Sequence, residues 1–140
     1  MEPIEDVDFI KGDIFDKSMT SLISAMSSSG FSTLLWYIRS PKISDLSPNI
    51  SGEHIVDYRN SCLLLDRVLD SYLACLTKDG NFVYKFFDGD KSNGTFCFLK
   101  ESSDYKKRLQ DIFKRCKVFK PRASRSESSE FYYVCIGKLK

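Results

Sequence analysis

Apolar side chains in the first part of the chain follow the two periods of regular secondary structure. Val7 to Ile10 has the composition of a short strand that ends in a turn at Lys11-Gly12-Asp13. From Asp16 to Met26 the apolar positions lie three or four residues apart, which predicts one face of a helix. The apolar run Leu34 to Ile38 comes next, but Pro41 interrupts the pattern, so the element it forms is left open.

The middle of the chain holds the strongest helical pattern, from about Val56 to Leu76. A turn at Lys78-Asp79-Gly80 then leads into Asn81 to Phe87, a run that is apolar nearly throughout. Such a run predicts a strand that is buried on both faces, as in a parallel sheet. Lys85 is the charged exception inside this strand.

Another helix and two strands complete the chain. The helix would place on one face Tyr105, Leu109, Ile112, Phe113 and Cys116. Val118-Phe119 and Phe131 to Ile136 have the composition of strands. Strands that alternate with helices predict an α/β fold in which helices cover the faces of the sheet. A length of 140 residues fits one domain.

The composition is that of a globular protein, with 42% hydrophobic and 29% charged residues. The apolar runs fall short of the roughly 20 residues that a membrane-spanning helix needs, so we expect no membrane association. The five cysteines form no CxxC pair, which argues against a zinc site and against a disulfide framework. We therefore expect reduced thiols and no metal ion.

Charge is distributed unevenly, although the net charge is only +2. The first 16 residues hold six acidic side chains, whereas Lys100 to Arg125 holds ten lysines and arginines against three acids. A basic segment of this density indicates a partner that carries phosphate groups. The alternative is a solvated helix face, which is at least as common for charge clusters in general.

Asp45, Lys85 and Glu130 are the charged residues whose positions suggest chemistry. Asp45 lies at a presumptive strand end, Lys85 inside an apolar strand, and Glu130 at the start of the last strand. A buried ammonium needs a partner, and ligands bind at the carboxyl ends of strands in open α/β sheets. A lysine between two carboxylates at this edge is therefore a candidate active centre. The alternative, an exposed lysine and two unrelated surface acids, is favoured by spacing alone.

Three segments around these residues resemble a known family: Ser44 to Gly52 (SDLSPNISG), Gly80 to Gly89 (GNFVYKFFDG) and Lys120 to Tyr132 (KPRASRSESSEFY). Their order and spacing closely resemble the FtsJ family of RNA ribose 2′-O-methyltransferases, and the run Lys-Pro-x-x-Ser-Arg-x-x-Ser-x-Glu is highly specific. Val7 to Asp13 is similar to the third strand of that family. The resemblance implies that residues 1–140 are a partial FtsJ-like domain. It covers nearly the whole chain apart from about Met26 to Lys42.

The resemblance implies a Rossmann-like, S-adenosylmethionine-dependent methyltransferase fold and a Lys-Asp-Lys-Glu catalytic tetrad. Asp45, Lys85 and Glu130 match the second, third and fourth members. Lys85 would orient the ribose 2′-hydroxyl and help to remove its proton, while Asp45 and Glu130 hold the ammonium. Asp13 would bind the adenine of S-adenosylmethionine, with Asp45 also near this cofactor. The alternative for Asp13 is an N-cap of the helix that follows, which is compatible with cofactor binding.

The resemblance also implies that Lys120, Arg122 and Arg125 contact RNA phosphates, with binding that weakens as salt rises. The Ser-Asp-x-x-Pro-Asn form favours large-subunit ribosomal RNA or a ribosomal subunit over tRNA, with uridine as the methylated nucleoside. We expect a monomer, and the likeness favours a mitochondrial location over a cytoplasmic or nucleolar one. Phe86 and Phe87 are interpreted as ordinary strand aromatics rather than base-stacking platforms, and the lone His54 is assigned no role.

Several parts of the family pattern have no match in this sequence. They are the glycine-rich loop, the first tetrad lysine, the first two strands and the acid that binds the cofactor ribose. We therefore expect an N-terminally truncated fold that binds S-adenosylmethionine poorly by itself. A non-catalytic RNA-binding remnant, an accessory subunit and a tRNA 2′-O-methyltransferase stay as alternative functions.

Overall fold

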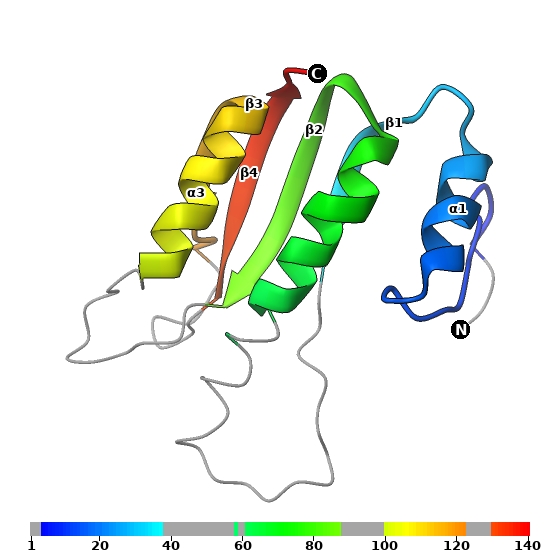
Figure 1. Ribbon diagram of the computed structural model, residues 1–140, viewed down its shortest axis with the longest axis horizontal. Coiled ribbons are helices and arrows are strands. Elements are labelled where there is room, and N and C mark those ends of the chain that lie inside the picture. Colours follow the sequence, from blue (N-terminus) through cyan, green and yellow to red (C-terminus); the bar gives the residue numbers. More distant parts are fainter. Residues whose placement is uncertain (1–3, 38–57, 59–60, 88–99, 123–129) are drawn as a thin grey trace, which may run out of the picture.

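The chain is described by a computed structural model that covers residues 4–37, 58, 61–87, 100–122 and 130–140. Its centre is a four-stranded sheet in the order β1-β2-β4-β3 (Figure 1). The strands are β1 (Phe31–Trp36), β2 (Leu76–Phe87), β3 (Phe113–Phe119) and β4 (Glu130–Lys138). β2 runs parallel to β1 and antiparallel to β4, and β3 is antiparallel to β4. The sheet is therefore mixed, with β2 and β4 at its centre.

Residues 61–75 form a helix, which we call the central helix. It is an α-helix over residues 61–67, a π-turn over Val68–Tyr72 and a 3₁₀ turn over Leu73–Cys75. Lys138, at the end of β4, donates hydrogen bonds from Nζ to the carbonyl oxygens of Leu73 (2.8 Å) and Leu76 (2.9 Å). The Leu73 carbonyl oxygen also accepts from the Leu76 amide, so Lys138 is a second donor there and ties the end of β4 to the junction between the central helix and β2.

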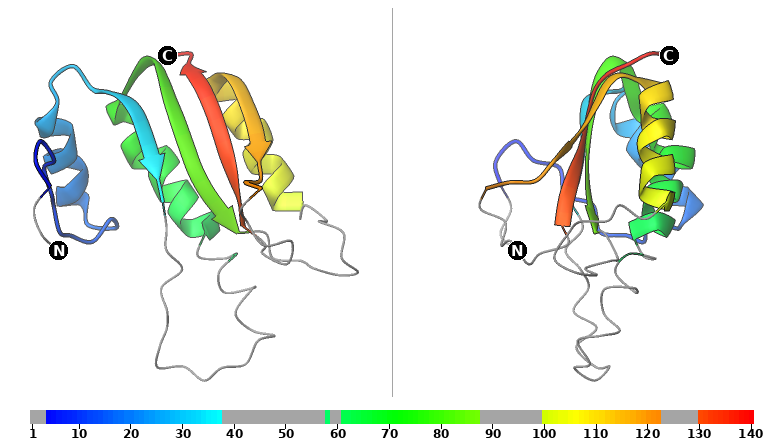
Figure 2. Two further views of the ribbon diagram at one scale, coloured as in Figure 1. Left: turned by 180° about the vertical axis from the view of Figure 1, so that it is seen from behind. Right: turned by 90° about the vertical axis from the view of Figure 1, so that its left-hand side faces the viewer.

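The central helix and α3 (Lys100–Ile112) cover the same face of the sheet (Figure 2). The side chains beneath them form the core, whose largest fully buried members are Tyr72, Phe82, Tyr84, Phe86, Phe113 and Tyr133. Among the described residues no helix covers the opposite face, which we call the open face. The prediction of helices on both faces is therefore not met in this part of the chain.

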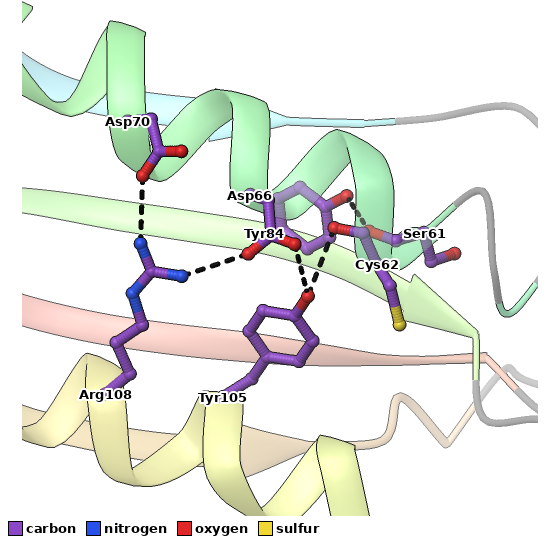
Figure 3. A network of polar contacts seen from close by, with 7 residues as sticks. All are labelled: Ser61, Cys62, Asp66, Asp70, Tyr84, Tyr105 and Arg108. Atoms are coloured by element: carbon purple, nitrogen blue, oxygen red, sulfur yellow. Dashed lines mark hydrogen bonds and ion pairs between the residues drawn. The ribbon is translucent and has the colours of Figure 1, made fainter.

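A network of polar side chains joins the two helices (Figure 3). Arg108 of α3 bridges Asp66 and Asp70 of the central helix, with both N···O distances at 2.9 Å. The Tyr105 hydroxyl donates to Asp66 at 2.8 Å. These contacts hold α3 beside the central helix, on the same face of the sheet.

The N-terminal segment packs on the other side of the central helix. Its helix α1 (Lys17–Met26) is capped by Asp16, whose carboxylate accepts from the amide of Ser18 at 2.9 Å. Arg67 and Tyr72 both donate to the carbonyl oxygen of Ile14, at 3.2 and 2.9 Å. The segment is thus attached through backbone carbonyl groups, and none of the α1 side chains is fully buried.

The structure corrects two of the predicted elements and assigns a third that the sequence left open. Residues 7–10 form no strand, and Val7 and Phe9 are exposed, because they have no strand partner in the described part of the chain. Phe113 and Cys116 belong to β3 rather than to a helix, since pairing with β4 replaces the helical bonds after Ile112. Of the run Leu34 to Ile38, whose element was open, residues 34–36 form the end of β1, Tyr37 follows the strand, and Ile38 lies outside the described residues.

The central helix, its end near residue 76 and the strand over residues 81–87 are confirmed. Leu76 itself already pairs with Phe31, and the expected turn at residues 78–80 is an irregularity within β2, with Asp79 at φ +63°. No helix in the described ranges has the length and hydropathy required to cross a lipid bilayer.

Candidate active site

Lys85 and Glu130 meet on the open face, near the carboxyl end of β2. In the β2–β4 register Lys85 lies opposite Tyr132, and Phe87 lies opposite Glu130. Glu130 is therefore the diagonal neighbour of Lys85 on the same face, a separation of roughly 7–8 Å between backbones that a lysine side chain can span. The contact forms, with Lys85 Nζ 2.9 Å from Glu130 Oε2.

The lysine is largely withdrawn from water and the carboxylate is less so. The Lys85 side chain is 7% exposed, whereas that of Glu130 is 25% exposed. This buried lysine is the charged residue that the sequence pattern singled out inside an apolar strand. The structure thus brings Lys85 and Glu130 together, as expected, although they lie far apart in the sequence.

Aromatic rings surround the ammonium on its other sides. Its Nζ lies 4.5 Å from the ring centroid of Tyr37 and 5.0 Å from that of Phe87. Such cation–π contacts stabilise a charged amine by about 0.5–2 kcal/mol each, depending on solvation. Phe87 is therefore part of the wall around Lys85, whereas Phe86 is fully buried on the helix face, as expected for a strand aromatic.

The surroundings keep Lys85 protonated. Burial alone would lower its pKa, but the hydrogen bond and negative charge of Glu130, with smaller contributions from Tyr37 and Tyr132, raise the pKa above its usual value. The pKa of Tyr132 is also raised, chiefly by burial. At neutral pH the centre therefore holds an ammonium that can donate hydrogen bonds to an oxygen atom.

The remaining predicted residues are less closely tied to this centre. Asp45, His54 and Arg125 lie outside the described residues. Asp13 is described and exposed, and its carboxylate accepts from the amide of Phe15 at 2.9 Å. The helix cap is Asp16 rather than Asp13, because the chain makes one further turn before α1 begins. The alternative interpretation of Asp13 as the N-cap is therefore wrong, and its role in cofactor binding stays a prediction.

Lys120 and Arg122 follow β3, where Lys120 is half-buried and Arg122 is exposed. Their role towards RNA stays a prediction. The described ranges contain no cluster of His, Cys, Asp or Glu that would hold a metal ion. The four described cysteines are free thiols, and Cys116 and Cys135 lie opposite each other across β3 and β4.

Tyr37 and Tyr132 were missed as members of the site. Tyr132 could have been found from strand alternation, because Glu130 and Tyr132 must share a face of the last strand. Tyr37 had no such signal, since the sequence did not assign Leu34 to Ile38 to an element. Its place beside Lys85 depends on the parallel pairing in which Trp36 lies opposite Tyr84.

Comparison with known proteins connects this geometry to a family. The profile of the FtsJ-like methyltransferases matches residues 1–138. The chain belongs to the FtsJ-like methyltransferase family. The resemblance seen in the sequence motifs is thereby confirmed, and the mixed sheet with its two helices is the FtsJ-like part of an α/β methyltransferase fold.

Two curated relatives of this FtsJ-like chain are named ribosomal RNA large subunit methyltransferase E. The protein of Methanosarcina acetivorans is 34% identical over 133 residues, which cover 94% of this chain and 42% of the relative. The protein of Francisella tularensis subsp. novicida is 33% identical over 135 residues, which cover 96% of this chain and 57% of the relative. The chain thus spans about half the length of these curated relatives.

A solved structure from Plasmodium falciparum, described as that of a ribosomal RNA methyltransferase, has a similar fold. It superposes with a TM-score of 0.68 at 20% identity, over 99% of this chain and 68% of the other. At this identity the similarity concerns the fold alone.

Proposed function

We propose that this chain acts in the transfer of a methyl group from S-adenosylmethionine to a ribose 2′-hydroxyl of RNA, with uridine of the large-subunit ribosomal RNA as the target. The observation that carries the proposal is the Lys85–Glu130 pair, a buried ammonium held at 2.9 Å by a partly exposed carboxylate. FtsJ-like family membership and the names of the curated relatives support the reaction class and the RNA substrate.

The chemistry of the pair suits the orientation of a hydroxyl group. The Lys85 ammonium has three N–H donors, of which Glu130 occupies one at the measured contact. A further donor directed at a ribose oxygen would fix the hydroxyl in one orientation, and such positioning supplies much of the rate of a transfer between two bound molecules. The proposed role of Lys85 is therefore first that of a positioning donor.

Because its raised pKa keeps Lys85 protonated at rest, this side chain must lose a proton before it can accept one from the hydroxyl group. S-adenosylmethionine would supply an electrophilic methyl group on a sulfonium and, as a cation, would lower the pKa of an amine beside it. With its pKa so lowered, Lys85 would release one proton to water and, as the neutral amine, could accept the hydroxyl proton while Glu130 holds the side chain in place. Asp13 has an exposed carboxylate suited to an amino group, as a cofactor-binding role would need.

The assay is methyl transfer from radiolabelled S-adenosylmethionine to large-subunit ribosomal RNA by the purified chain, with the methyl donor at high concentration to offset the weak binding expected of this chain. A 2′-O-methyl group blocks alkaline cleavage of the adjacent bond, so the label should appear in alkali-resistant dinucleotides. Lys85→Met should abolish the transfer, whereas the control Lys78→Met, an exposed lysine earlier in β2, should leave it unchanged. Unchanged transfer by Lys85→Met, or label in the bases, would contradict the proposal.

The alternative is a non-catalytic RNA-binding role. It is distinguished by the same assay, because it predicts RNA binding without any transfer by the unmodified chain. Substrate RNA from a tRNA pool serves as the comparison for the choice of ribosomal RNA. The mitochondrial location stays a prediction, to be checked by imaging the tagged protein in its cell.

A further inference from the structure

The open face carries one row of side chains that crosses all four strands. Tyr37 follows β1, Lys85 lies in β2, Tyr132 lies opposite Lys85 in β4, and Phe119 lies opposite Tyr132 in β3. Residues directly opposite each other in antiparallel strands point to the same face. Phe119 therefore continues the row of side chains beside Lys85 towards the edge of the sheet. Two strand spacings place Phe119 about 10 Å from Lys85.

Phe119 is unusually exposed for an aromatic residue of a strand, at 54%. Its neighbour Val118 packs against the core on the helix face, so Phe119 must point the other way. Figure 2 also shows that β3 bends away from the side of the helices as it approaches this residue. An exposed ring on a strand edge, beside a partly buried tyrosine, offers a flat apolar surface to a ligand.

The charges around this ring specify the kind of ligand. Arg115 and Lys117 alternate with Cys116 and Val118 along β3, and so they lie on the open face with Phe119, and both are exposed. Of the acids in the described strands, Glu130 is paired with Lys85 and Asp79 is paired with Lys114. The combination of exposed rings with a positive strand edge is typical of surfaces that bind single-stranded nucleic acid.

We infer that Phe119, flanked by Tyr132, stacks against a base of single-stranded RNA whose neighbouring ribose lies at Lys85. The inference rests on the proposed function for the identity of the reacting ribose, but the binding itself can be measured separately. Arg115 and Lys117 would contact the phosphates of the same strand. A paired base cannot offer its face to a ring on the surface, so this contact selects unpaired RNA.

The first test is binding of a fluorescein-labelled oligouridylate of about ten nucleotides, a length within the usual site sizes of single-strand-binding surfaces. Fluorescence anisotropy with the full chain at low salt gives Kd without any methyl donor. Phe119→Ala should raise Kd by about fivefold or more, and Phe119→Trp should restore it. Leu35→Ala is the matched control, because Leu35 is 65% exposed on the same face but lies on β1, and it should leave Kd unchanged.

The second test uses the same oligonucleotide in a duplex, for which Phe119→Ala should change Kd by less than about twofold, since paired bases do not present a free face. In the methyl-transfer assay Phe119→Ala should raise KM for RNA and leave kcat unchanged. Lys85→Met should do the reverse, with transfer lost and oligouridylate binding retained. If no chain transfers methyl groups, the proposed function fails, while the anisotropy result still decides the stacking role.

Three results would overturn the inference. One is an equal Kd for oligouridylate in Phe119→Ala and the unsubstituted chain, and another is an equal loss in Leu35→Ala. The third is sedimentation evidence that copies of the chain associate and that Phe119→Ala separates them, because the ring would then be part of a protein interface. Circular dichroism confirms the fold of each variant, and a substitution at so exposed a position should cost little stability.

Discussion

Loss of Glu130 and loss of Lys85 should have unequal effects on the free energy of unfolding. Glu130→Ala leaves an ammonium that is 7% exposed without its carboxylate. Removal of one partner from a fully buried pair costs about 3–5 kcal/mol, whereas replacement of the whole pair by apolar side chains is often neutral. Because Glu130 is 25% exposed and two rings still contact the amine, we expect a smaller loss, about 2 kcal/mol.

Lys85→Met removes the buried charge and keeps an unbranched apolar side chain among Tyr37 and Phe87. The carboxylate that remains can be solvated, so this variant should lie within about 1 kcal/mol of the unsubstituted chain. The double variant should be more stable than Glu130→Ala alone. The coupling between the two sites should therefore be about 1–2 kcal/mol, as for contacting residues in general.

Urea unfolding followed by circular dichroism measures the four free energies of this cycle. The raised pKa of Lys85 means that the folded chain holds this proton more tightly than the unfolded chain does. The stabilisation is thus complete below the unfolded pKa of about 10.4 and is lost as pH rises through the folded pKa. The difference in the free energy of unfolding between the unsubstituted chain and Glu130→Ala should be constant from about pH 6 to 8 and should become smaller in alkali. Additive free energies, or a Glu130→Ala variant of unchanged stability, would refute the reasoning.

Further predictions concern packing, backbone and caps. Phe86→Ala should cost about 3–5 kcal/mol in urea unfolding, because the ring is fully buried among aromatic neighbours; a loss below 1 kcal/mol would contradict this packing. Gly30→Ala should destabilise by about 1–3 kcal/mol, since Gly30 has φ +79° and an added Cβ would lie 2.9 Å from the Cys75 carbonyl oxygen. The pKa of Asp16 is lowered by its bonds to Ser18, so the α1 cap should persist above the usual carboxyl pKa and be lost as pH falls through the lowered one. Hydrogen exchange at the Ser18 amide should accelerate in that range, and equal rates at pH 2 and pH 6, after correction for intrinsic exchange, would exclude the cap.

Sequence patterns correctly predicted the elements whose apolar period matches the face that is buried in the fold. The central helix and β2 are of this kind, because each has a strong apolar period and each is buried where that period places it. The pattern also singled out Lys85 as a charge inside an apolar strand, whereas its pairing with Glu130 was expected from the family resemblance, because spacing alone favoured an exposed lysine and unrelated acids. The π-turn at Val68–Tyr72 has no counterpart in spacing rules, which do not distinguish it from an α-helix.

The failures have identifiable physical causes. Phe113 and Cys116, three residues apart, have the spacing of a helix face, but pairing with β4 decides that they belong to a strand. Val7 to Ile10 has strand composition, but composition cannot supply a partner strand. Tyr37 and Phe119 acquired their places beside Lys85 and Tyr132 from the register of three strand pairs, which no local pattern specifies.

The position of β4 between β2 and β3 has a consequence for the order in which the chain can fold as it is synthesised. β3 pairs only with β4 within the described sheet, and β4 (Glu130–Lys138) is the last of the four described strands in chain order. Until these residues have left the ribosome, β3 has no ladder to join in the described sheet and Lys85 lacks Glu130. Domains that complete their sheet with a late, non-local strand expose apolar surface until that strand arrives. Assembly of the Lys85–Glu130 pair should therefore wait for β4, the last of the four described strands to be synthesised, which completes both the described sheet and the candidate active site.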